Sequence, residues 1–245
     1  MIKTVLLVLF GGLVLFGGLK FGKLAATGAT MLLSLVLYAQ VWGWRYAAGF
    51  LLLLFIHEMG HFIAARQRGL DVGAPTFIPF VGAWIDLKEI PRDVETEAHV
   101  AISGPLLGSF AAFLVYFAAG YYDSRLLLAI AYSGFFLNLF NMLPISPLDS
   151  GRVTAVLSPR VWFFGVPLLA GLMFWRPSPV LFMIALFAAP QLMKAWRYDP
   201  NAPENVAYYG ISTAKKFEYT VMYLGLTGAL ALMTYEVYQT LTGVR

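Results

Sequence analysis

The chain has 245 residues, of which 60% are hydrophobic and 12% are charged. Soluble domains hold about 45–50% apolar and about 25% charged residues, so this composition excludes an ordinary soluble protein. The net charge of +4 arises from Lys and Arg dispersed at the ends of apolar segments, a pattern that does not favour a nucleic-acid partner. The absence of cysteine excludes a disulfide framework and any thiolate metal site.

A helix that crosses a bilayer needs about 20 apolar residues, and the chain holds a series of apolar segments near that length. They lie at 4–19, 25–43, 46–66, 99–121, 125–143, 161–175, 179–196 and 219–240. We therefore expect an all-α polytopic membrane protein with about 6–8 transmembrane helices. The first segment lacks a small-residue cleavage site, so we interpret it as a retained helix and not as a signal peptide.

The third apolar segment, 46–66, carries His57, Glu58 and His61 in the sequence HEMGH. Ionisable groups at bilayer depth are costly, and they are therefore rare and usually functional. On a helix the two histidines lie one turn apart on one face, where they can hold one zinc ion while Glu58 reaches a water activated by the metal. The motif predicts a metalloprotease site inside the membrane. The alternative is a pair of packed histidines beside a buried glutamate, as in a proton relay.

Residues 75–87, after this helix, are apolar and aromatic and are interrupted by Pro79 and Gly82. This composition predicts a short β-hairpin or strand pair at the membrane surface. The hairpin either pairs with an unwound substrate by strand addition or anchors a surface loop through its Phe and Trp side chains.

Gly104 and Gly108 lie one helical turn apart in the fourth apolar segment. Small residues at this spacing let two membrane helices approach closely, so we expect them to pack against the helix that carries HEMGH.

A catalytic zinc usually has three protein ligands, and Asp149 is the candidate for the third. It stands in NLFNMLPISPLDSGR at the end of the fifth segment, at the depth expected for the histidines. Pro144 and Pro147 bend the chain there, and irregular backbone at membrane depth is tolerated where it lines a cavity. An ordinary turn aspartate is the alternative. Asn138 and Asn141 lie one turn apart just before it.

Lys and Arg are unevenly divided between the two sides that alternating spans define, and the richer side is expected to be cytoplasmic. That side holds twelve: Lys20, Lys23, Arg66, Arg68, Lys88, Arg92, Arg152, Arg160, Lys194, Arg197, Lys215 and Lys216. The other side holds five: Lys3, Arg45, Arg125, Arg176 and Arg245. The histidines would then lie roughly 8–14 Å below the cytoplasmic surface at 1.5 Å per helical residue.

HEMGH at 57–61, SGPLLGS at 103–109 and NMLPISPLDSG at 141–151 together resemble the site-2 proteases, the intramembrane zinc metalloproteases of peptidase family M50. The resemblance covers roughly residues 46–157 and suggests a minimal bacterial-type member. It implies that His57, His61 and Asp149 hold one zinc ion per chain and that Glu58 is the catalytic base. It further implies that Asn141 holds the substrate backbone or the developing oxyanion. The chain has LDSG where the family usually has LDGG.

The resemblance implies three regions: an N-terminal transmembrane hairpin (1–45), a catalytic core (46–157), and C-terminal helices with a cytoplasmic interfacial segment (158–245). It also implies an enzyme of the cell membrane that cuts single-span substrates, such as anti-sigma-like regulators or remnant signal peptides, with the bilayer as its surroundings. Two other classes stay open: a relative that binds membrane clients without cutting them, and an ion or proton transporter. A transporter predicts inverted repeats, and none is found in the sequence.

Overall fold

The computed structural model describes residues 22–85, 88, 89 and 91–243, and the expected span at 4–19 lies outside this part of the chain. The long helices are α2 (Gly22–Trp42), α3 (Trp44–Gln67), α4 (Val94–Tyr121), α5 (Arg125–Asn141), α8 (Pro179–Trp196) and α10 (Thr213–Thr242). The shorter elements are β1 (Thr76–Ile78), β2 (Gly82–Trp84), α6 (Asp149–Thr154), the 3-10 helix η1 (Pro159–Phe164), α7 (Gly165–Trp175) and α9 (Pro203–Tyr209). The protein is therefore mostly helical with one small antiparallel hairpin, as the sequence predicts.

Five of the described helices, namely α2, α3, α4, α8 and α10, are long and apolar enough to cross a membrane. The helix α5 and the run 159–175 are apolar but shorter. Large apolar side chains point outward from the bundle, for example Phe110 and Phe117 of α4, which are 60% and 66% exposed. Such a surface is unfavourable in water and suits contact with lipid, which supports a membrane protein.

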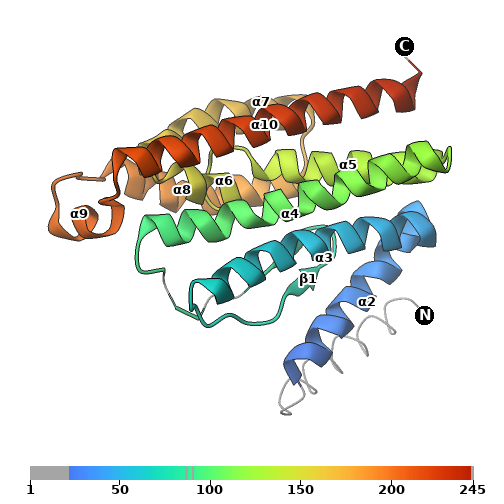
Figure 1. Ribbon diagram of the computed structural model, residues 1–245, viewed down its shortest axis with the longest axis horizontal. Coiled ribbons are helices and arrows are strands. Elements are labelled where there is room, and N and C mark those ends of the chain that lie inside the picture. Colours follow the sequence, from blue (N-terminus) through green and yellow to red (C-terminus); the bar gives the residue numbers. More distant parts are fainter. Residues whose placement is uncertain (1–21, 86–87, 90, 244–245) are drawn as a thin grey trace.

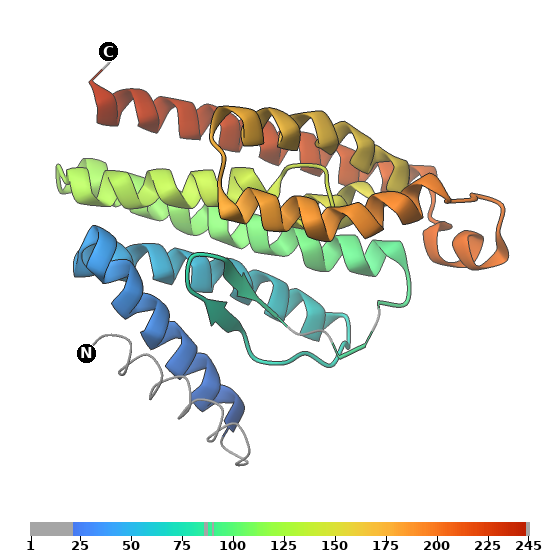
Figure 2. The ribbon, with the colours of Figure 1, turned by 180° about the vertical axis from the view of Figure 1, so that it is seen from behind.

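Helices α3, α4, α5 and α10 run side by side along the long axis of the molecule, and α2 crosses α3 obliquely (Figures 1 and 2). Glycine allows the closest of these contacts. A Cβ atom at Gly60 of α3 would collide with the Ser103 carbonyl oxygen of α4, and one at Gly104 would collide with the His61 ring. The expectation that Gly104 packs against the HEMGH helix is correct. Gly108 instead faces α5, where its missing side chain makes room for Asn138.

Capping side chains extend two helices beyond the segments expected from hydropathy. Asp93 accepts a hydrogen bond from the Thr96 amide at 2.7 Å, so α4 begins at Val94 and not near residue 99. Ser212 caps α10 in the same way and accepts from the Lys215 amide at 3.3 Å. A cap satisfies amides that otherwise lack a partner at a helix start, which is why polar residues precede the apolar runs as part of the same helices.

The hairpin is attached to α2 by hydroxyl groups that are spaced along one face of that helix. Thr27 Oγ1 donates to the Pro75 carbonyl at 2.6 Å. The Phe77 amide donates to Thr30 Oγ1 at 3.3 Å, and the Phe80 amide donates to Tyr38 Oη at 3.0 Å. Helix α2 therefore lies along the outer edge of β1.

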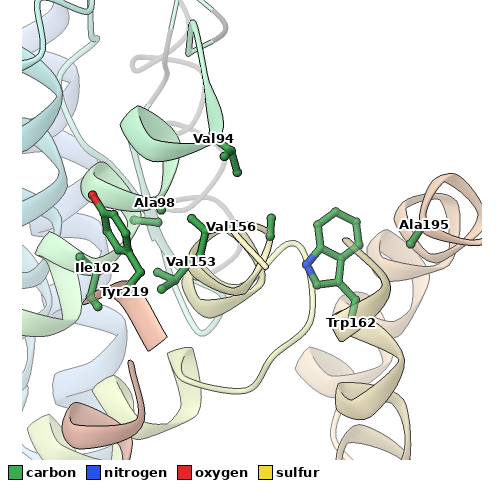
Figure 3. Close-up of a cluster of buried hydrophobic side chains, with 10 residues drawn as sticks. Val94, Ala98, Ile102, Val153, Val156, Trp162, Ala195 and Tyr219 are labelled. Atoms are coloured by element: carbon green, nitrogen blue, oxygen red, sulfur yellow. The ribbon is translucent and has the colours of Figure 1, made fainter. Parts of the chain in front are cut away.

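Helix α6 is held by a cluster of buried side chains from α4, α6, η1, α8 and α10 (Figure 3). The cluster comprises Val94, Ala98, Ala101, Ile102, Val153, Ala155, Val156, Trp162, Ala195 and Tyr219. Asp149 is the first residue of α6, so this packing sets the position of its carboxylate.

Polar contacts join α9 to the start of α4, close to α6. Tyr208 Oη donates to Glu97 Oε2 at 2.7 Å, and Arg152 Nε of α6 lies 3.9 Å from Glu97 Oε1. The pKa of the neighbouring Tyr209 is raised to about 12. Burial of the phenol is the main cause, and the negative charge of Glu97 adds to it. The phenol of Tyr209 is therefore protonated at physiological pH.

Candidate metal centre and active site

The HEMGH motif forms one turn in the second half of α3, within an apolar span. His57 and Glu58 are 2% and 4% exposed. The imidazole rings of His57 and His61 lie 4.8 Å apart at an interplanar angle of 81°, and their Nε2 atoms are 3.2 Å apart. The helical spacing thus brings two ligand atoms to one point, as the sequence predicts.

Asp149 approaches this point from α6. Its Oδ2 lies 3.2 Å from His57 Nε2 and 3.3 Å from His61 Nε2. The ligand atoms of the three residues all lie within 4.8 Å of one another. The structure therefore brings together the three residues that the sequence suggests as metal ligands.

The irregular segment that leads into α6 has its polar backbone atoms satisfied by nearby side chains. Tyr223 of α10 donates to the Met142 carbonyl at 2.9 Å, and Trp162 Nε1 donates to the Gly151 carbonyl at 2.6 Å. Ser150 is buried and donates to the Leu143 carbonyl, so the departure from LDGG supplies a further contact. Backbone away from water needs such partners, and these contacts define the position of Asp149.

The partners of Nδ1 determine which nitrogen of each histidine can bind a metal. His61 Nδ1 lies 2.9 Å from the Val100 carbonyl oxygen of α4, which only accepts hydrogen bonds. Nδ1 must therefore carry the proton, and Nε2 presents its lone pair to Asp149. His57 Nδ1 lies 2.8 Å from Asn138 Oδ1.

The residues present fit a zinc ion. Two imidazole nitrogens and one carboxylate oxygen are a usual donor set for catalytic zinc, and donors about 2.0–2.1 Å from a tetrahedral ion lie roughly 3.3 Å apart. The three separations here are 3.2, 3.2 and 3.3 Å. Asp149 Oδ2 is buried and has no hydrogen-bond partner within the described residues, as expected for an atom that binds a metal.

Glu58 follows His57 on α3, and its carboxylate interacts electrostatically with His57, His61 and Asp149. It is therefore a buried acid that interacts with all three candidate ligands.

Asn141, the expected substrate or oxyanion contact, lies at the C-terminal end of α5. It is partly buried, and its Nδ2 donates to the Leu137 carbonyl of the same helix at 3.2 Å. Its role toward a substrate remains a prediction. Asn138, one turn earlier, is the asparagine that contacts a candidate metal ligand, His57.

The sequence did not assign a role to Asn138 or to the Val100 carbonyl. Asn138 carries a weak signal, an amide on an otherwise apolar helix at the depth of HEMGH. The Val100 carbonyl has no sequence signal, because any residue supplies a backbone carbonyl.

Comparison with known proteins finds zinc metalloproteases among the relatives of the chain. Residues 45–124 match the model of peptidase family M50. A zinc metalloprotease of Methanocaldococcus jannaschii is 28% identical over 119 residues, which cover 44% of this chain and 34% of that protein. The probable chloroplastic zinc metalloprotease EGY1 of Arabidopsis thaliana is 35% identical over 83 residues, which cover 32% of this chain and 15% of that protein. The matched part thus spans about a third, or less, of the length of these relatives. These matches make residues 45–124 similar to peptidase family M50 and the chain similar to zinc metalloproteases.

Proposed function

We propose that the protein is an intramembrane zinc endopeptidase that cuts peptide bonds in or near the transmembrane segments of membrane-anchored substrates. The observation that carries this proposal is the convergence of His57, His61 and Asp149 from two helices, with Glu58 buried beside them. Ionisable groups gathered in an apolar span are costly, and a bound metal that does chemistry accounts for them.

Each residue has a distinct task in the proposed reaction. His57, His61 and Asp149 would hold a zinc ion, whose chemistry when bound would be that of a Lewis acid for the scissile carbonyl and for water at neutral pH. Glu58 accepts the proton of the attacking water and delivers it to the leaving amine. Asn141 is the proposed hydrogen-bond donor to the substrate backbone or to the oxygen on which charge develops.

The hairpin offers one edge to a substrate strand, and the contacts of β1 indicate which edge that is. Phe77 pairs with Ala83, and the Phe77 amide donates to Thr30 of α2 and so points away from β2. Opposite residues in an antiparallel pair direct their backbone groups alike, so the Ala83 N–H and C=O point away from β1. A locally unwound substrate would add to β2, the strand that α2 does not cover.

The arrangement of helix ends supports the proposed orientation. The end of α3, the start of α4, the end of α8 and the start of α10 lie at the same end of the bundle (Figures 1 and 2). This end carries Arg66, Arg92, Lys194 and Lys215, which belong to the richer group of basic residues. We propose that it faces the cytoplasm, which places the site near the cytoplasmic face of the cell membrane.

The proposed substrates are single-span membrane proteins, such as anti-sigma-like regulators or remnant signal peptides. A transmembrane segment must unwind locally before a protease can reach its backbone, because its amides are bonded within the helix. Helix-weakening Gly, Pro or Asn near the cut are therefore expected.

The decisive experiment compares the purified wild type with Glu58→Gln on a panel of single-span substrates in detergent, with bound zinc counted in both. We expect cleavage by the wild type, a loss of roughly 10²–10⁴-fold in the variant, and equal zinc in both, because glutamine cannot accept the proton. Full cleavage by the zinc-loaded variant would disprove the proposed mechanism. Zinc without cleavage by either protein favours a client-binding relative, and no zinc in either favours ion transport.

A further inference from the structure

The side chain of Asn138 lies between the metal centre and the body of α5. It is 1% exposed, its Oδ1 lies 2.8 Å from His57 Nδ1, and its Nδ2 donates to the Gly134 carbonyl at 2.7 Å. Both ends of the amide are therefore engaged, one by a residue of α3 and one by its own helix.

Only one orientation of this amide satisfies both contacts. The Gly134 carbonyl oxygen can only accept, so it must face the NH₂ group of Asn138. Exchange of the amide oxygen and nitrogen would place two carbonyl oxygens against each other. Oδ1 therefore faces His57, and His57 Nδ1 must be the donor of the hydrogen bond that joins them.

Helix α4 prevents the amide from moving away. A Cβ atom at Gly108 would lie 2.5 Å from Asn138 Oδ1 and 2.9 Å from Nδ2, so α4 and the amide are in close contact. The position of the hydrogen-bond acceptor is thus set by packing as well as by the Gly134 carbonyl.

We propose that Asn138 is a positioning residue that fixes His57 as the Nδ1–H tautomer, with Nε2 directed to the metal. Metal-bound histidines commonly donate their second ring N–H to a carboxylate or carbonyl that orients the ring. An amide performs this task without placing a third carboxylate beside Asp149 and Glu58. An additional buried charge is costly inside a membrane. The proposal rests on the proposed function only in taking His57 as a metal ligand.

The test measures zinc affinity by chelator competition, and the visible spectrum of the cobalt-substituted protein, for the full chain in detergent. Asn138→Leu keeps the volume and removes the acceptor, and we expect its zinc affinity to fall by about 10–100-fold. Asn138→Asp keeps an acceptor for His57 and, when its second oxygen is protonated, a donor for the Gly134 carbonyl, so it is expected to bind zinc more tightly than Asn138→Leu. A folded Asn138→Leu variant with wild-type affinity and spectrum would overturn the proposal.

Asn141→Ala is the matched control on the same helix, because the Asn141 amide bonds only to its own helix in the described contacts. It should bind zinc as tightly as the wild type and lose cleavage. Zinc binding by a wild type that cuts no substrate would remove the protease proposal and leave this one intact.

A measurement on the wild type decides the question if Asn138→Leu does not fold. The chain has three histidines, so ¹⁵N-histidine labelling gives few ring signals. In the zinc-loaded protein His57 should show a protonated, slowly exchanging Nδ1. Metal bound through His57 Nδ1, or a rapidly exchanging ring proton, would refute the proposal.

Discussion

At the residue scale, the positions of the candidate metal ligands depend on neighbouring glycines. The spacing of Gly104 and Gly108 predicts close helix packing, and the structure shows that this packing is against His61 and Asn138. Gly104 touches the His61 ring, whose Nδ1 is held by the Val100 carbonyl at 2.9 Å. The ring therefore cannot turn away without losing that hydrogen bond.

A methyl group added by Gly104→Ala should consequently displace His61. We expect a loss of about 1–3 kcal/mol in the free energy of unfolding, typical of overpacking, together with weaker zinc binding. Gly120→Ala is the matched control on α4, because a Cβ there meets nothing within 4 Å. Thermal melting and zinc titration of both variants check this expectation, and equal zinc affinities would contradict it.

At the scale of elements, α2 and the hairpin behave as one unit because hydroxyls of α2 bond to the hairpin backbone. Thr27, Thr30 and Tyr38 make these contacts, and Tyr38 also packs edge-on against Phe80 at 5.1 Å between ring centroids. The edge of β1 is thereby covered by α2, and β2 is the edge that we propose for strand addition.

Ala83→Pro tests the role of that edge. Proline removes the outward N–H of Ala83, so we expect slower substrate cleavage with zinc content unchanged. Ala83→Ser, which keeps the N–H, should cleave at nearly the wild-type rate. Wild-type cleavage by Ala83→Pro would show that the β2 edge does not hold the substrate.

At the scale of the whole molecule, the helices are held by apolar clusters that do not include the metal ligands. The fold should therefore survive loss of the metal while the activity does not. Zinc that binds only the folded protein stabilises it, by about 2.7 kcal/mol when its free concentration is 100 times Kd.

Chelation should accordingly abolish cleavage, leave the helical circular-dichroism signal in place and lower the melting temperature. Added zinc should restore the melting temperature of the wild type but not that of Asp149→Ala, which lacks one ligand. Glu204→Ala, on exposed α9, should respond to zinc as the wild type does. A zinc-dependent shift in Asp149→Ala would mean that Asp149 is not a ligand.

The sequence by itself determined the properties that arise within one segment. The apolar runs determined the helical membrane class, and the spacing of His57 and His61 placed both on one face, because helical periodicity is local. The apolar and aromatic residues of 75–87, interrupted by Pro79 and Gly82, predicted the hairpin in the same way.

Only the tertiary structure decided which distant groups meet. His57 and Asn138 are 81 positions apart, and His61 and the Val100 carbonyl are 39 apart. The covered edge of β1 likewise depends on Thr30, 47 positions from Phe77. These contacts follow from how α2, α3, α4 and α5 pack, and packing is set by the shapes of many side chains together, which no local pattern records.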